Sequence, residues 1–195
     1  MSSPTTLHVD PEQLFAGAGP LRVYQPRLVP GLLQTEPYAR AHLARQLAWQ
    51  GGPTDLEDAV ARRMSLWRQL TAQGRHCTIL LDELVLYTRV CPEAPMINQL
   101  SQVERLAQEP NIDLGVVPSD ARLPVWVCEG FCLYGTTHAV TYALTGVRHV
   151  DSPPEISAYT RAYQAMFDRA AKGPDARALI ASAAEYWDLL LAEQG

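Results

Sequence analysis

The stretch LVPGLLQTEPYARAHLARQ, residues 28–46, joins a sharp turn to the start of a helix. A proline fixes one φ angle and Gly31 follows with a permissive backbone, so the chain can turn before two leucines. We expect Leu32 and Leu33 to be buried, and Gly31 to need a backbone conformation that a Cβ would strain. Thr35 stands where a helix N-cap belongs, so the motif predicts a buried turn that leads into a helix.

The segments around this motif alternate between helical and extended patterns. Apolar runs at 77–87 and 111–119 predict strands that are covered on both faces, and the helical spacing between them predicts a parallel crossover. The segments 125–135 and 139–150 are rich in β-branched and aromatic residues, which predicts an antiparallel hairpin. We therefore predict an α/β or α+β fold, with a mixed sheet of about four strands, a parallel pair plus an antiparallel hairpin, packed by about five helices.

Length and composition are those of a soluble globular protein. The chain has 195 residues, of which 47% are hydrophobic and 19% are charged. No apolar run approaches the roughly 20 residues of a membrane helix, and the N-terminus lacks a signal-peptide pattern. We expect a cytoplasmic protein without membrane contact, with a flexible N-terminal arm at 1–20 and a single domain at 21–195.

The charges disfavour a nucleic-acid surface and a lysine-based mechanism. The net charge is −5, and all basic residues except Lys172 are arginines, which suit bidentate anion sites. Lys172 lies at a predicted helix end, where a solvated charge is expected. No glycine-rich phosphate loop is present, and we predict no cofactor.

The cysteines are expected to be free thiols. Cys128 and Cys132 are spaced so that both sulfurs would lie on one face of a strand. Structural zinc sites usually need closer pairs and a matching second pair. We predict small buried thiols and no metal site.

Several segments resemble, in order, a bacterial domain of unknown function that usually forms the C-terminal part of helix-turn-helix regulators of the xenobiotic-response-element type. They are YQPRLVPGLLQTEPYARAHL, LLDELVL, NIDLGVVP, LTGVRHVDSPPEISAYTRAYQAMFDRA and DARALIASAAE, within residues 21–187. The resemblance implies a sensory or partner-binding module, so we expect residues 21–195 to form a single regulator-type ligand-binding domain. Two features depart from the family pattern. Only about 20 residues precede the first motif, whereas family members usually carry DNA-binding helices there. Near the Thr145-Gly146 pair, Tyr142 stands where the family commonly has a glutamate.

The first two predicted helices, which run from Thr35 to about Gln50 and from Thr54 to just before Gly74, do not resemble a DNA-binding pair. The second of them opens with Asp55, Glu57 and Asp58, which would repel phosphates at the end where a recognition helix meets DNA. We therefore expect the module without its DNA-binding half.

Three carboxylates, Glu129, Asp82 and Glu83, are the candidate catalytic residues. Asp82 and Glu83 are adjacent in a predicted strand, so they face opposite sides and cannot act as a pair on one substrate. At least one should point into a covered face, where it either pairs with an arginine such as Arg63 or Arg89 or anchors a ligand.

Glu129 is the sharper candidate. A regular strand over 125–134 would place it on an apolar face with Val125, Val127, Phe131 and Leu133. An acid in such surroundings can donate a proton or hold a polar ligand group. Gly130 could instead introduce a bulge that directs Glu129 to solvent.

Aromatic residues near these strands could line a pocket for an apolar small molecule, although core packing is their commoner fate. The predicted ligand-binding residues are Tyr24, Gln34, Arg89, Trp126, Tyr134, Tyr142 and His149.

We therefore expect a ligand- or partner-binding domain without its own DNA contacts. Its partner would be a small molecule, and a protein partner and a homodimer stay open. The alternative is a cofactor-independent enzyme, a cyclase or isomerase of specialised natural-product biosynthesis, that uses the same pocket.

Overall fold

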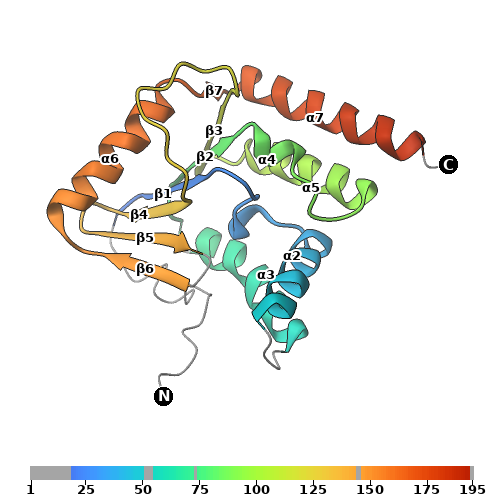
Figure 1. Cartoon of the computed structure of the whole chain (residues 1–195), viewed down its shortest axis with the longest axis horizontal. Coiled ribbons are helices and arrows are strands. Elements are labelled where there is room, and N and C mark those ends of the chain that lie inside the picture. The colour runs from blue at the N-terminus through green and yellow to red at the C-terminus, as the bar shows by residue number, and fades with distance from the viewer. Residues whose placement is uncertain (1–18, 51–54, 73, 144–145, 194–195) are drawn as a thin grey trace.

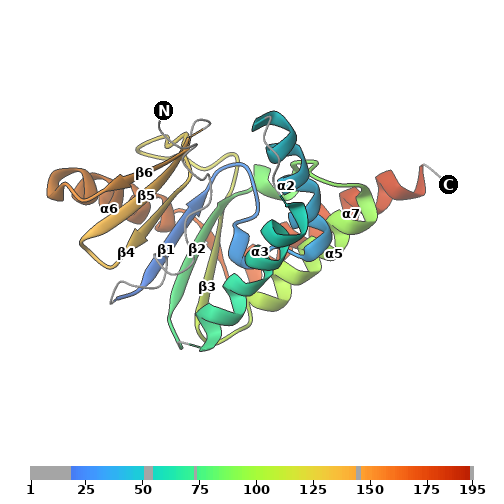
Figure 2. The same ribbon diagram turned by 90° about the horizontal axis from the view of Figure 1, so that it is seen from below.

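The computed structural model describes residues 19–50, 55–72, 74–143 and 146–193, so the predicted flexible arm at 1–20 lies almost wholly outside the described residues. Within them, a mixed seven-stranded sheet has the order β6-β5-β4-β1-β2-β3-β7. Helices pack on both faces of this sheet (Figures 1 and 2).

The sheet has a parallel centre and antiparallel flanks. The parallel strands are β1 (Leu21–Gln25), β2 (Cys77–Asp82) and β3 (Ile112–Val117). On one side follow the antiparallel strands β4 (Phe131–Tyr134), β5 (His138–Ala143) and β6 (Gly146–Val150). On the other side β3 pairs with the short antiparallel β7 (Ala171–Lys172).

The helices divide between the two faces. A 3-10 turn η1 (Gly31–Leu33) leads into the hairpin of α2 (Glu36–Gln50) and α3 (Leu56–Ala72). On the same face lie α4 (Leu84–Tyr87), α5 (Glu93–Leu106) and α7 (Pro174–Ala192), and the last two run side by side. The opposite face is covered by α6 (Pro153–Phe167) (Figure 1).

The predicted numbers of strands and helices are wrong, although the α+β class, the parallel β2–β3 pair and the β4–β5 hairpin are confirmed. The described residues form seven strands and six α-helices. Segment 139–150 supplies most of β5 and all of β6, and β7 has only two residues. β1 has five residues, too few to give a strong alternation, yet it is the strand between the parallel and antiparallel parts.

Residues 77–87 form a strand only as far as Asp82. Glu83 follows in a turn, and the next four residues form α4. A run that is apolar on both alternations fits a buried strand and a buried helical turn equally well, so the pattern could not separate them. Asp82 and Glu83 therefore lie at the carboxyl end of β2 and not in its middle.

Among the described helices, none has the length and apolar character that crossing a membrane requires.

Candidate ligand-binding site

The turn before α2 is held by buried amide and hydroxyl groups. Gln34 Nε2 donates to the Val29 carbonyl at 2.7 Å, and the Val29 amide donates to the Tyr38 hydroxyl at 3.1 Å. From α5, the fully buried Gln99 donates to the Leu33 carbonyl at 2.8 Å. Leaving these buried groups without partners would cost free energy. The turn is therefore held in one conformation, and it forms one wall of the cavity described below.

Gly31 is needed for space and not for its backbone conformation. Its φ angle is not positive, so the predicted backbone strain is wrong. A Cβ on Gly31 would instead lie 2.9 Å from Arg63 Cδ and 3.1 Å from Arg63 Nη1. Leu32 and Leu33 are buried, as predicted.

A cavity of about 290 Å³ lies among this turn, α2, α3 and the strands β1, β4 and β5. Apolar side chains make most of its wall, chiefly Leu21, Val23, Leu28, Val29, Leu32 and Leu66. Polar side chains enter from β1, the turn, α2 and α3, namely Gln25, Gln34, His42, Gln46, Arg62 and Arg63. Among the described residues that line it, none is Asp or Glu. A mostly apolar cavity with a few converging polar groups is typical of a small-molecule site.

Arg63 is the half-buried cation of this cavity. Its Nη1 donates to Gln34 Oε1 at 2.9 Å, and Gln34 is itself fixed by its bond to Val29. In the part of the chain that the structure describes, no carboxylate forms an ion pair with Arg63. Burial lowers the pKa of Arg63 from its ordinary value, against a smaller opposite effect of Tyr142. A guanidinium nonetheless stays charged in proteins, so the cavity contains a positive charge in a fixed orientation.

Cys132 of β4 and Tyr142 of β5 also line the cavity. Cys132 Sγ and the Tyr142 hydroxyl lie 3.3 Å apart. Burial raises the pKa of Cys132 to about 11 and the pKa of Tyr142 well above its ordinary value. Both groups are neutral at pH 7, so this wall offers hydrogen bonds without a reactive thiolate.

Two of the predicted ligand-binding residues, Gln34 and Tyr142, line the cavity, and five do not. Those five are Tyr24, Arg89, Trp126, Tyr134 and His149.

Arg89 and His149 have partners outside the cavity. Arg89 pairs with Glu93 and lies over the Trp187 ring, 5.0 Å from its centre. The His149 ring is hydrogen-bonded to His138 at 3.1 Å on the β5–β6 side of the sheet.

A second polar cluster lies at the carboxyl ends of β1 and β2. The Tyr24 hydroxyl is 3.1 Å from each carboxylate oxygen of Asp82 and 3.1 Å from the Val127 carbonyl. Burial raises the pKa of Asp82, and this outweighs the hydrogen bond from Tyr24 and the charge of Arg27, which lower it. Burial also raises the pKa of Tyr24, so its hydroxyl remains a donor. We call Tyr24 and Asp82 the edge pair.

Glu83 is also bound by the segment that follows β3. Its carboxylate accepts from the Ser119 amide at 2.7 Å and from the Ser119 hydroxyl at 2.6 Å. Of the two partners considered for these acids, Arg63 contacts Gln34 and Arg89 contacts Glu93. Neither Asp82 nor Glu83 forms the arginine ion pair considered above within the described residues.

Glu129 lies in a loop and not in a strand. Residues 118–130 form no regular strand, and β4 begins only at Phe131. The Glu129 side chain is exposed and accepts a hydrogen bond from the Tyr159 hydroxyl at 2.6 Å. The predicted apolar face around Glu129 is therefore wrong. Gly130 makes no bulge in a strand but leaves room for Gln25, whose Oε1 would lie 2.6 Å from a Cβ at this position.

The same loop separates the two cysteines. Cys128 is exposed in the loop and Cys132 is buried in β4, so they do not share the face of one strand.

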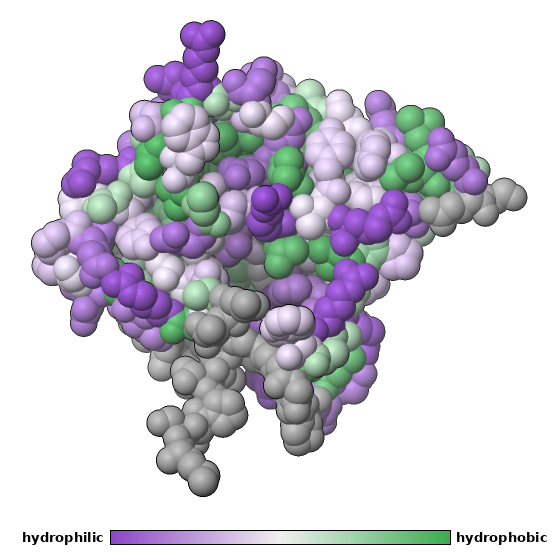
Figure 3. All heavy atoms as spheres, in the orientation of Figure 1, coloured by the Kyte–Doolittle hydropathy of each residue, from purple (hydrophilic) through white to green (hydrophobic). Residues whose placement is uncertain are grey.

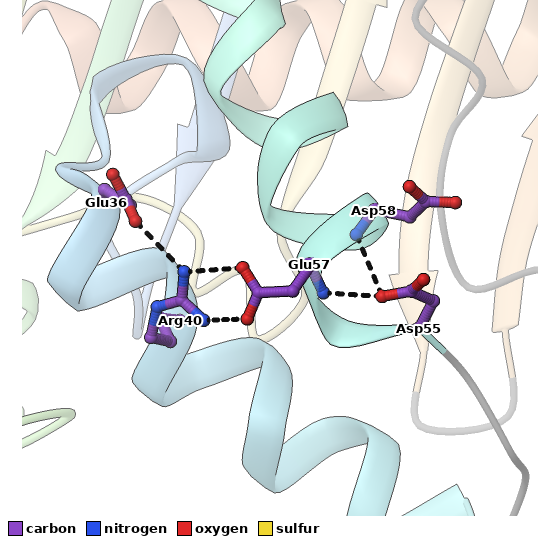
Figure 4. Close-up of polar contacts among 5 residues, drawn as sticks. All are labelled: Glu36, Arg40, Asp55, Glu57 and Asp58. Atoms are coloured by element: carbon purple, nitrogen blue, oxygen red, sulfur yellow. Dashed lines mark hydrogen bonds and ion pairs between the residues drawn. The ribbon is translucent and has the colours of Figure 1, made fainter.

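The N-terminal end of α3 is acidic (Figure 4). Asp55 Oδ1 accepts from the amides of Glu57 and Asp58 at 2.9 and 3.3 Å. Arg40 on α2 contacts Glu57 at 2.5 Å and Glu36 at 3.0 Å, and this hydrogen bonding lowers the pKa of Glu57. The Arg40–Glu57 ion pair connects α2 to α3.

Apolar side chains also reach the surface away from the cavity. Near the C-terminal end of α7, where hydrophobic atoms gather in Figure 3, Tyr186, Leu189 and Leu191 are exposed. In the loop before β4, Trp126 is 78% exposed. A protein partner and a homodimer stay predictions.

Arg63 and His42 are among the cavity residues that sequence reasoning missed. Arg63 lies at helical spacing between Ala59 and Leu66, which are both buried, so an arginine inside an apolar stripe was the available signal. His42 is half-buried and lines the cavity.

The comparisons with known proteins identify a family. No curated protein matches the chain. The profile described as "Domain of unknown function (DUF5753)" matches residues 12–182, which is most of the chain and confirms the predicted resemblance to a domain of unknown function. This protein therefore belongs to the DUF5753 family.

Proposed function

We propose that this domain binds a small molecule in the cavity between the turn, the α2–α3 hairpin and the sheet. We further propose that this is the sensory activity that such a domain contributes to helix-turn-helix regulators. The observation that carries the proposal is an apolar cavity with one oriented, half-buried guanidinium and no Asp or Glu among its described lining residues.

The positions of the candidate catalytic acids favour binding over catalysis. The three candidate catalytic residues, Glu129, Asp82 and Glu83, are absent from the described lining, and each accepts hydrogen bonds from another part of the chain. The buried thiol in the cavity has a raised pKa, which disfavours nucleophilic chemistry. An enzyme using this cavity would lack the poised carboxylate on which the alternative depends.

A neutral apolar dye tests the proposal directly. N-phenyl-1-naphthylamine is weakly fluorescent in water and brighter in apolar surroundings, and we expect the folded chain to bind it saturably with one site. Ala143 lines the cavity and is exposed, so Ala143→Trp should obstruct the cavity while the fold is retained. We expect this variant to bind the dye at least tenfold more weakly.

Ala61→Trp is the matched control, because Ala61 is an exposed residue of α3 outside the cavity lining. Equal dye binding by Ala143→Trp and Ala61→Trp, or no saturable binding by the unmodified chain, would contradict the proposal.

A further inference from the structure

We infer that the ligand of this cavity is an amphipathic organic monoanion, a carboxylate with an apolar body, whose headgroup pairs with Arg63. This inference rests on the proposed binding function and names its ligand class.

Arg63 carries a positive charge that no described carboxylate neutralises. A half-buried cation is costly unless an anion or several acceptors surround it. Within the described residues Arg63 has one hydrogen-bond partner, Gln34 Oε1, and no carboxylate. A guanidinium has five N–H donors, so donors remain for a ligand.

The Arg63 side chain is also held in one orientation by its neighbours. Gln34 is fixed by the Val29 carbonyl and accepts from Arg63, while Gly31 leaves the space that the Arg63 side chain fills. The guanidinium is therefore preorganised before a ligand arrives. A planar fork of donors matches the two oxygens of a carboxylate, and preorganisation reduces the entropy lost on binding.

The charges that line the cavity favour a ligand headgroup with a single negative charge. The other arginine of the cavity, Arg62, is exposed and lies 3.8 Å from the Asp58 carboxylate. One unpaired guanidinium balances one negative charge, so a monoanion fits better than a phosphate dianion. The leucine and valine wall then requires an apolar body behind the headgroup.

A pair of probes with the same chain length tests this ligand class. Octanoate and octan-1-ol differ in the headgroup, and octanoate is ionised at pH 7.5. Each is titrated against the dye complex of the full chain, and displacement gives its affinity. We expect octanoate to bind at least tenfold more tightly than octan-1-ol.

Variants of Arg63 assign this preference to one residue. Arg63→Gln should reduce the preference for octanoate to less than threefold, while Arg63→Lys should keep part of it. Arg68→Gln removes the same charge from an exposed position of the same helix outside the cavity lining, and it should keep the full preference. The neutral dye reports on cavity binding in every variant.

The outcomes test the ligand class separately from the proposed binding function. If both probes displace the dye equally well from the unmodified chain, or if Arg63→Gln keeps the preference, the ligand class is wrong and the binding function stands. If neither the dye nor either probe binds, both are overturned. The comparison of the two probes on the unmodified chain does not depend on whether any variant folds.

Discussion

The cavity and the carboxyl edge of the sheet both contain charged side chains, but the two regions differ in which groups form hydrogen bonds with them. At the edge, Asp82 accepts from Tyr24, Glu83 from Ser119 and Glu129 from Tyr159. In the cavity, Arg63 has one neutral partner and no carboxylate among the described residues.

Ligands of open α/β sheets commonly bind beyond the carboxyl ends of the strands. Here the segment 118–130 lies over those ends, and its own atoms take up the hydrogen bonds of Tyr24 and Glu83. The chain thus satisfies its polar groups at the usual position and leaves a charge to be neutralised elsewhere. This difference in hydrogen bonding between the two regions predicts that substitutions in the cavity alter ligand binding, whereas substitutions at the carboxyl edge alter stability alone.

The largest effect is expected for Gly31→Val. The new side chain would overlap Arg63 Cδ, and overpacking of this kind typically costs about 1 to 3 kcal/mol in the free energy of unfolding. Displacing Arg63 should also lower octanoate affinity at least tenfold, and denaturant unfolding together with dye displacement would measure both.

A double-mutant cycle sharpens this prediction. Because the clash is with one side chain, Gly31→Val should cost less in an Arg63→Ala background than in the unmodified chain. If the two substitutions proved additive, the role of Gly31 would lie in its backbone and not in its contact with Arg63.

Tyr24→Phe should have the next largest effect, on stability alone. Removing the hydroxyl leaves Asp82 and the Val127 carbonyl without this donor, which typically costs about 1 to 2 kcal/mol in the free energy of unfolding. Dye and octanoate binding should be unchanged, because Tyr24 does not line the cavity. A loss of binding in a folded Tyr24→Phe chain would show that the two regions are coupled.

The sequence predicted those parts of the site in which local chemistry decides the structure. The proline-glycine turn and its buried leucines follow from residues that are neighbours in the chain. The role of Arg63 could not be predicted in the same way, because it depends on Gly31 and Gln34, which lie about thirty positions away on another element.

Segment 125–130 shows the opposite failure, in which local pattern misled. Its β-branched and aromatic residues fit a strand, but a strand needs a partner to which it can bond. β4 pairs with β1 from Tyr134 to Phe131, and β1 ends at Gln25, one residue beyond Tyr24, the partner of Phe131. On the other side of β4, β5 runs on to Ala143, and the Tyr142 amide still donates to the Gly130 carbonyl at 3.1 Å. The short length of β1 therefore removes the partner on one side only, and no composition pattern of the 125–134 segment contains that information.

Asp82→Asn should have a small effect that depends on pH. The folded chain raises the pKa of Asp82, so the stabilising contribution is complete below the ordinary value of about 3.9 and is lost as the pH rises through the folded value. Asparagine keeps an acceptor for Tyr24 and does not ionise. The variant should thus gain stability relative to the unmodified chain from pH 4 towards pH 7.

The gain should stay below about 1 kcal/mol, because Asp82 is only partly buried and water screens its charge. Thermal unfolding at several pH values would measure it. A difference between the two chains that is the same at every pH would mean that the Asp82 carboxylate is not desolvated in the folded state.

Glu129→Gln should have the smallest effect of all, and it tests the comparison most directly. Glu129 was the strongest sequence-based candidate for a catalytic acid, but it is exposed and lies outside the described cavity lining. Glutamine keeps an oxygen that can accept from the Tyr159 hydroxyl, so the free energy of unfolding should change by less than about 0.5 kcal/mol. Burial raises the pKa of Tyr159 to about 12, with the Glu129 carboxylate adding to the shift, so the variant should lower that pKa slightly.

Dye and octanoate binding by Glu129→Gln should match binding by the unmodified chain. A tenfold loss of either in the folded variant would move the functional site from the cavity to the carboxyl edge, since no hydrogen bond or ion pair among the described residues joins Glu129 directly to Arg63.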